Sequence, residues 1–156
     1  MMGKRKRMEL ILWRHAEAED AVGGDDMGRA LTKRGRKQAE RVGEWLKPRL
    51  SDEWLVLASP AMRAVQTAKG LGMDFEERET LVPGASARAV LAEAGWPGRD
   101  RPVVIVGHQP TLGEAAAMLM GAADGLAIRK GAAWWFVYKN DEAMLRAVID
   151  AEMLDR

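Results

Sequence analysis

The chain contains two histidines, His15 and His108, and each closely follows an apolar run of the length of a strand. The runs at residues 10–13 and 103–106 are continuous rather than alternating, as expected for strands covered on both faces. In open α/β sheets, side chains that follow parallel strands project into a crevice at the carboxyl edge of the sheet. If these two strands are parallel neighbours, the two imidazoles meet at that edge.

Two arginines belong to the same edge. Arg14 directly precedes His15, and Arg63 falls in the first turn of a helix predicted after a third apolar run at residues 55–58. Arginine offers forked, permanently charged donors that match phosphate oxygens, and helix N-termini add backbone donors. A neutral imidazole can attack phosphorus and form a phosphohistidine that water then hydrolyses. The four side chains predict a phosphoryl site that requires no metal and no other cofactor, although a lone histidine after a strand is more often structural.

The elements that must position these residues follow from periodicity and capping residues. A helix is expected from the cap residue Thr32 to Pro48, and a second one from Ser59 as N-cap, with Pro60 at its first position, to about Leu71. Further helices are expected at residues 85–94 and 110–120, each ended by a glycine. Strands at 134–138 and 144–149 should pair in antiparallel across residues 139–141. The pattern predicts a three-layer α/β/α sandwich with a mostly parallel central sheet.

Length and composition limit the other functions. The 156 residues predict one domain over residues 1–156, with residues 1–7 as a flexible basic lead-in. The net charge of +1 gives no global field for nucleic acid or an anionic membrane, and no apolar run is long enough to span a bilayer. The absence of cysteine excludes disulfides and a catalytic thiol. We expect a cytoplasmic protein with no nucleic-acid or membrane partner, and the sequence does not indicate its oligomeric state.

Four segments resemble signatures of the histidine phosphatase superfamily. Residues 12–18 resemble its Arg-His-Gly segment, residues 58–68 its Ser-Pro-x-x-Arg-Ala-x-Gln-Thr-Ala segment, and residues 106–110 its Val-Gly-His-x-Pro segment. Residues 26–35 are similar to the Asp-x-x-Arg-x-Leu-Thr-x-x-Gly segment of the short, SixA-like phosphohistidine phosphatase branch. The resemblance, in chain order from about Glu9 to Leu119, implies a phosphoglycerate mutase-like fold.

The resemblance also implies roles for individual residues. His15 would be the nucleophile, Arg14 and Arg63 would clamp the phosphate, and His108 would donate to the phosphoryl oxygens. The short-branch match adds Arg29 as a substrate-binding pocket residue. The chain departs from the family in two ways: Ala16 replaces the usual glycine, and the chain is too short for the inserted segment that carries an acid in larger branches. Glu17 is the nearest carboxylate in sequence and a further candidate for substrate binding, with the more distant Asp26 and Glu79 as other possible acids.

These observations predict a phosphatase that acts through a covalent phosphohistidine on His15. An imidazole leaves with less help from an acid than an alkoxide does, so a phosphohistidine on a partner protein, such as a histidine phosphotransfer domain, is the expected substrate. A phosphatase for a small phosphorylated metabolite is the first alternative. A phosphate-binding module without turnover is the second. A metal site is disfavoured, because the two arginines would repel a cation.

Overall fold

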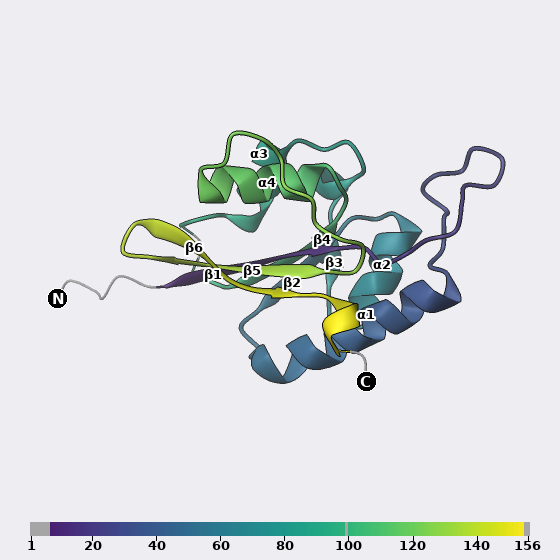
Figure 1. Ribbon diagram of the computed structural model, residues 1–156, viewed down its shortest axis with the longest axis horizontal. Coiled ribbons are helices and arrows are strands. Elements are labelled where there is room, and N and C mark those ends of the chain that lie inside the picture. The colour runs from purple at the N-terminus through teal and green to yellow at the C-terminus, as the bar shows by residue number, and fades with distance from the viewer. Residues whose placement is uncertain (1–6, 99, 155–156) are drawn as a thin grey trace.

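A single mixed sheet forms the middle layer of the fold (Figure 1). The computed structural model describes residues 7–98 and 100–154, so the predicted lead-in at residues 1–7 lies, except for Arg7, outside the described residues. The strands lie in the order β3-β2-β4-β1-β5-β6. Their bounds are β1 (Met8–Arg14), β2 (Leu55–Ala58), β3 (Glu76–Glu77), β4 (Val103–Gly107), β5 (Ala133–Lys139) and β6 (Glu142–Ile149). The first four strands of this order are parallel, and β5 and β6 form the predicted antiparallel pair.

Helices cover both faces of the sheet (Figure 1). The helices α1 (Lys33–Leu46) and α2 (Met62–Lys69) pack on one face, and α3 (Ala87–Ala94) and α4 (Thr111–Met120) pack on the other. Short 3-10 helices lie at η1 (Lys47–Arg49), η2 (Glu79–Leu81) and η3 (Ala151–Leu154). The predicted three-layer α/β/α sandwich is therefore confirmed. No helix in the described ranges is long and apolar enough to cross a membrane.

The helix caps explain most of the predicted boundaries. The Thr32 hydroxyl accepts a hydrogen bond from the Gly35 N–H at the start of α1, as its position predicted. Gly95 and Gly121 end α3 and α4 in the left-handed conformation, with φ of 69° and 70°. The predicted start of the third helix at residue 85 was early, because Ser86 is the residue whose hydroxyl caps α3.

The prediction that Ser59 caps the second helix was wrong. α2 begins at Met62, and its N-cap, Ala61, makes no side-chain capping bond. The Ser59 hydroxyl instead accepts from the Ala61 N–H and bonds the His108 ring across the sheet. The Ser59 hydroxyl, which the local sequence pattern assigned to helix capping, is therefore bonded to His108, a residue distant in sequence.

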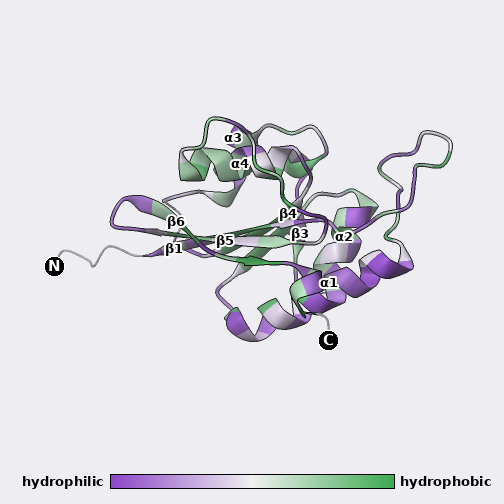
Figure 2. Cartoon of the chain, viewed as in Figure 1, coloured by the Kyte–Doolittle hydropathy of each residue, from purple (hydrophilic) through white to green (hydrophobic). Residues whose placement is uncertain are grey.

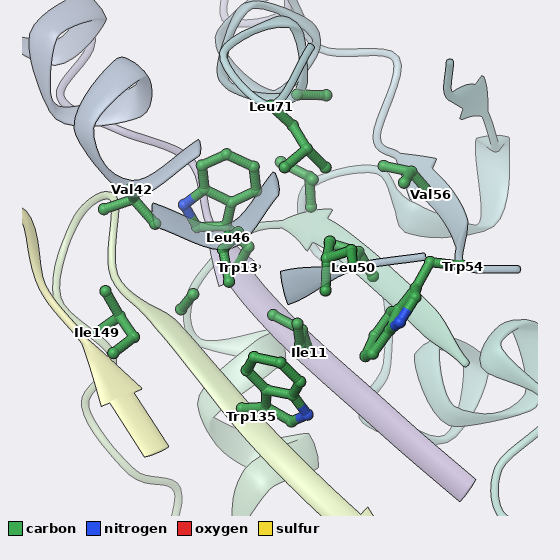
Figure 3. Close-up of a cluster of buried hydrophobic side chains, with 14 of the residues drawn as sticks. Ile11, Trp13, Val42, Leu46, Leu50, Trp54, Val56, Leu71, Trp135 and Ile149 are labelled. Carbon is green, nitrogen blue, oxygen red and sulfur yellow. The ribbon is translucent and has the colours of Figure 1, made fainter. Parts of the chain in front are cut away.

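The core holds the central strands rigidly from both sides. On the α1 and α2 face, Trp13 is fully buried and Trp135 is 5% exposed, among the side chains shown in Figure 3. On the other face, Leu12, Ile105 and Phe136 are fully buried. Apolar residues therefore line both sides of the sheet, and parts of its strands have the green of hydrophobic residues in Figure 2. The residues that follow β1 and β4 are attached to the most fixed part of the molecule.

Close contact between α1 and α2 gives a test of this packing. A Cβ atom on Gly43 would collide with the backbone carbonyl of Gly70. Gly43→Ala should therefore lower the free energy of unfolding by about 1–3 kcal/mol, despite the higher helix propensity of alanine. Urea denaturation measures the change, with Gly98→Ala, at a position with open space, as the control. A Gly43→Ala variant as stable as the wild type would contradict the packing.

Candidate active site

Parallel pairing of β1 and β4 brings the two histidines together. Arg14 lies opposite Gly107 in the sheet register, so His15 and His108 follow side by side at the carboxyl edge. Their ring centroids are 5.2 Å apart, and the exposed fractions of the residues are 7% and 4%. The His15 N–H donates to the Gly107 carbonyl at 3.0 Å, which continues the strand pairing into the site. The structure thus places the two imidazoles where the strand pattern predicted.

The turn after β1 fixes the tautomer of His15. The ring Nδ1 lies 2.7 Å from the Ala16 carbonyl oxygen, and since a carbonyl only accepts, Nδ1 carries the proton. In the neutral ring the Nε2 lone pair is then available to attack an electrophile. The Ala16 N–H donates to the Thr67 hydroxyl at 3.0 Å, and Thr67 in turn donates to the Arg63 carbonyl. The turn after β1 and residues of α2 therefore hold the imidazole in one orientation.

Both imidazoles are kept neutral by their surroundings. Burial lowers the pKa of His15 to about 4, assisted by the charges of Arg63, Arg14 and Arg29 and opposed by the bond to the Ala16 carbonyl. Burial also lowers the pKa of His108 to about 3, with further contributions from the charge that His15 carries once it is protonated and from the charge of Arg63. At neutral pH, His15 therefore has the uncharged form that a nucleophile needs.

Three buried nitrogens of the site have no hydrogen-bond partner among the described residues. Arg14 Nη1 donates to the Ile128 carbonyl at 2.9 Å, while burial lowers the pKa of its guanidinium. In the described part of the chain, the buried side-chain nitrogen and oxygen atoms without a partner are Arg14 Nε, Arg63 Nε and His108 Nδ1. A buried polar group without a partner costs about 1–3 kcal/mol, so such groups at one edge of a sheet call for an explanation. An anion with several oxygens could accept from all of them.

Ser59 sets the role of the second imidazole, and the sequence reasoning assigned it only to capping. Its hydroxyl lies 2.8 Å from His108 Nε2 and accepts from the Ala61 N–H at 3.2 Å. When the hydroxyl donates to Nε2, the ring proton lies on Nδ1, which then becomes a donor to a bound oxygen. The signal for this role was the position of Ser59 directly after β2, at the same edge as the histidines.

The structure places the two predicted substrate-binding residues differently. Arg29 Nη1 lies 3.2 Å from a carboxylate oxygen of Asp26, and the charge of Arg29 lowers the pKa of His15, which places it near the site. The Glu17 carboxylate accepts from the Thr32 hydroxyl at 2.8 Å, and Glu17 lines, together with Arg34, a hollow of about 260 Å³ at the start of α1. Substrate binding by Glu17 stays a prediction.

Asp26 is part of the arginine cluster, although the sequence named it only as a distant candidate acid. Arg63 donates to its backbone carbonyl at 2.8 Å and to its carboxylate at 3.1 Å. Loss of water contact opposes ionisation, but hydrogen bonds from Arg63 and Arg29 outweigh it and lower the pKa of the Asp26 carboxyl. Asp26 is therefore ionised at neutral pH, and it fixes the Arg63 guanidinium with Nε left free. Among the described residues, no group of three or more acidic, histidine or cysteine side chains is arranged to hold a metal ion.

The lowered pKa values predict how the molecule responds to acid. NMR titration should find both imidazoles still neutral at pH 6, with His15 half-protonated near pH 4 and His108 near pH 3. The unfolded chain binds more protons over the range from about pH 4 to about pH 6.5, so the free energy of unfolding should fall as the pH is lowered through it. Urea denaturation at both ends of that range measures this fall. An imidazole that titrates at or above pH 6.5 in the folded enzyme would contradict the burial argument.

Comparison with known proteins agrees with the fold and with the four sequence segments. The model of the histidine phosphatase superfamily (branch 1) matches residues 10–83. A phosphohistidine phosphatase SixA homolog of Haemophilus influenzae is 35% identical over 129 residues, which cover 73% of this chain and 78% of the relative. The solved structure of the protein histidine phosphatase SixA complexed with tungstate has a TM-score of 0.82 at 21% identity, covering 94% of this chain and 99% of the other. A mutant phosphoserine phosphatase of Entamoeba histolytica, in complex with phosphoserine, has a TM-score of 0.73 at 16% identity, covering 94% and 99%.

The sandwich with this strand order is the phosphoglycerate mutase-like fold, and the chain belongs to the histidine phosphatase superfamily. Within it, the chain is a phosphatase of the SixA-like branch, which confirms the resemblance seen in the four sequence segments.

Proposed function

We propose that this phosphatase removes the phosphoryl group from phosphohistidine on a partner protein, through a covalent intermediate on His15. The observation that carries the proposal is the set of three unpaired buried donors, Arg14 Nε, Arg63 Nε and His108 Nδ1, beside the neutral imidazole of His15. Three oxygens of a transferring phosphoryl group would satisfy these donors. The positive charges would stabilise the negative charge that those oxygens carry in the transition state.

In the first step, His15 Nε2 attacks phosphorus as the bond between phosphorus and the leaving nitrogen breaks. The phosphorylated His15 ring gains positive charge, which the hydrogen bond from Nδ1 to the Ala16 carbonyl stabilises. In the second step, water attacks phosphorus on the side opposite Nε2. The Nε2–P bond then breaks, the water loses its proton to solvent, inorganic phosphate leaves, and the neutral imidazole is restored.

The carboxylates near the site support a leaving group that needs little acid catalysis. Asp26 is held ionised by two arginines, and the Glu17 carboxylate is bonded to Thr32. Neither is placed to donate a proton to a departing alkoxide. An imidazole of phosphohistidine can instead take its proton from water before it leaves. The relative from Haemophilus influenzae, which carries the name phosphohistidine phosphatase, adds weight to this substrate.

A small phosphorylated metabolite is the second candidate substrate. It is favoured by the fold that the chain shares with the phosphoserine phosphatase of Entamoeba histolytica, although 16% identity supports the fold alone. The lack of an assigned acid argues against a serine or sugar ester, whose alkoxide leaves poorly.

A substrate panel separates the two candidates. The purified enzyme, in a chelator, is given a histidine-phosphorylated phosphotransfer domain, phosphoserine and sugar phosphates. We expect kcat/KM for the phosphorylated domain to exceed that for either ester by at least about 100-fold, with inhibition by vanadate. A higher kcat/KM for phosphoserine or a sugar phosphate would assign the enzyme to a metabolite. Loss of all activity in chelator, restored by a divalent ion, would contradict the mechanism.

A further inference from the structure

The first turns of α1 carry an unusual charge pattern. Lys33, Arg34 and Lys37 are exposed there, and the first turn contains no acidic residue. Cations at a helix N-terminus oppose the helix dipole, and like charges three or four residues apart repel each other. Within the described residues, none of these three side chains forms an ion pair. Stability of the helix therefore does not account for them.

The start of α1, which carries these cations, packs against the turn that follows the nucleophile. The Thr32 N–H, just before α1, donates to the Glu17 carbonyl at 3.0 Å, and Gly35 packs directly on the same carbonyl. Glu17 is two residues after the nucleophile, His15. The start of α1 thus forms one side of the rim around the phosphoryl site, and it is the strongly hydrophilic end of that helix in Figure 2.

The other side of the rim, called the apolar side here, carries three exposed apolar side chains. Val22, Met27 and Met62 are 85%, 40% and 43% exposed, which makes them three of the eight large apolar side chains exposed in the described chain. The Met62 N–H donates to the Met27 carbonyl at 2.9 Å, and Met62 directly precedes Arg63. The loop that carries Val22 and Met27 projects beyond the sheet edge (Figure 1). Exposed methionines adapt to the shape of a protein partner and are frequent at binding surfaces.

The two sides face the same end of the molecule. The Leu31 N–H donates to the Gln66 side chain at 2.7 Å, which joins the segment before α1 to α2. The loop from Ala18 to Leu31 therefore connects the apolar side to the basic side. Both helices begin at the edge of the sheet where β1 ends, directly before His15 (Figure 1).

We infer that this rim, made of Val22, Met27, Met62, Lys33, Arg34 and Lys37, is the docking surface for the phosphorylated protein. Its partner should carry acidic side chains on one side of the phosphorylated residue and apolar ones on the other. The inference rests on the proposed function, which assigns a protein substrate. Complementary charge and a small apolar contact give selectivity and speed encounter without filling the phosphoryl site.

A surface with a basic side and an apolar side fits a protein partner better than a nucleic acid or an anionic membrane, which present negative charge throughout. The loop on the apolar side also carries the exposed acidic residues Glu19, Asp20 and Asp25, which would repel a nucleic-acid backbone or an anionic bilayer. The exposed face of α1 has no large exposed apolar side chain, which a helix lying in a membrane surface needs. A protein surface can match each side separately.

Two synthetic peptides test the docking surface. Each carries one phosphohistidine, flanked by glutamates in one peptide and by lysines in the other. The wild-type enzyme should hydrolyse the glutamate peptide with a kcat/KM at least about tenfold higher, and salt should reduce this preference. In the variant Lys33→Gln/Arg34→Gln/Lys37→Gln the ratio should fall close to one, while kcat/KM for an aryl phosphate stays within about twofold of wild type.

The matched control removes the same number of charges at the edge of the sheet where β1 begins, as Lys47→Gln/Arg101→Gln/Lys139→Gln, and should keep the preference. For the apolar side, Met27→Ser/Met62→Ser should lower kcat/KM for both peptides and leave kcat/KM for the aryl phosphate unchanged. The control Met118→Ser/Met120→Ser should change none of these values. An unchanged peptide ratio in the α1 variant would overturn the inference. So would binding of double-stranded DNA or phosphatidylserine vesicles that displaces the glutamate peptide.

Failure of the proposed function is distinguishable from failure of the docking surface. If the enzyme cleaves the aryl phosphate but neither peptide, phosphohistidine is not its substrate. Both peptides then serve as competing inhibitors of aryl phosphate turnover, and equal inhibition constants would overturn the docking surface as well. A lower inhibition constant for the glutamate peptide, lost in the α1 variant, would support it.

Discussion

His15→Ala should lower kcat for an aryl phosphate by at least about three orders of magnitude while leaving the binding of inorganic phosphate nearly unchanged. The reason is that the variant loses the only attacking atom, Nε2, whereas the donors of Arg14, Arg63 and His108 remain in place. Steady-state kinetics give kcat, and calorimetry gives the dissociation constant of phosphate.

Arg63→Ala provides the contrast to the nucleophile variant. Its charge acts on both the bound substrate and the transition state, so phosphate binding and turnover should weaken together. Turnover close to wild type in His15→Ala, in a variant with an unchanged unfolding transition, would show that another group attacks phosphorus.

The second large effect concerns the leaving group. Aryl phosphates with acidic phenols should be cleaved far faster than alkyl phosphates, because no placed acid neutralises the charge that builds on the departing oxygen. Asp26 is kept ionised by Arg63 and Arg29, and Glu17 is bonded to Thr32. A plot of log kcat/KM against phenol pKa, over several units at one pH, should have a steep negative slope.

A nearly flat slope, with the chemical step still limiting, would mean that a general acid protonates the leaving group. Glu17→Gln and Asp26→Asn would then identify it, because the variant that loses the acid would acquire a steep slope. Under the present mechanism, neither variant should change the slope.

Local patterns in the sequence predicted those helix ends and strands that are determined by residues close together in the chain. Thr32 and the glycines at 95 and 121 cap their helices as expected, because a cap depends on neighbours within a turn. The continuous apolar runs predicted buried parallel strands, and their pairing brought His15 next to His108.

The features that sequence reasoning missed depend on distant partners. Ser59 was assigned to a helix cap because Ser-Pro is a local capping pattern, yet its hydroxyl bonds His108, which is 49 positions away. Asp26 meets Arg63 across 37 positions. β3 has only two residues, both glutamates, and pairs because β2 offers a free backbone edge there. No periodicity could reveal such a strand.

The central claim is that the phosphoryl group passes through Nε2 of His15. Rapid mixing with substrate, an alkaline quench and mass spectrometry of the digested enzyme test it directly, because a phosphohistidine survives alkali and is lost in acid. The mechanism predicts one phosphoryl group on the peptide that contains His15, and none in His15→Ala. Phosphorus–nitrogen NMR coupling should show that this group is bonded to Nε2. A phosphoryl group on His108 would contradict this claim. Turnover with no phosphorylated enzyme during the first cycle, which indicates direct transfer to water, would also contradict it.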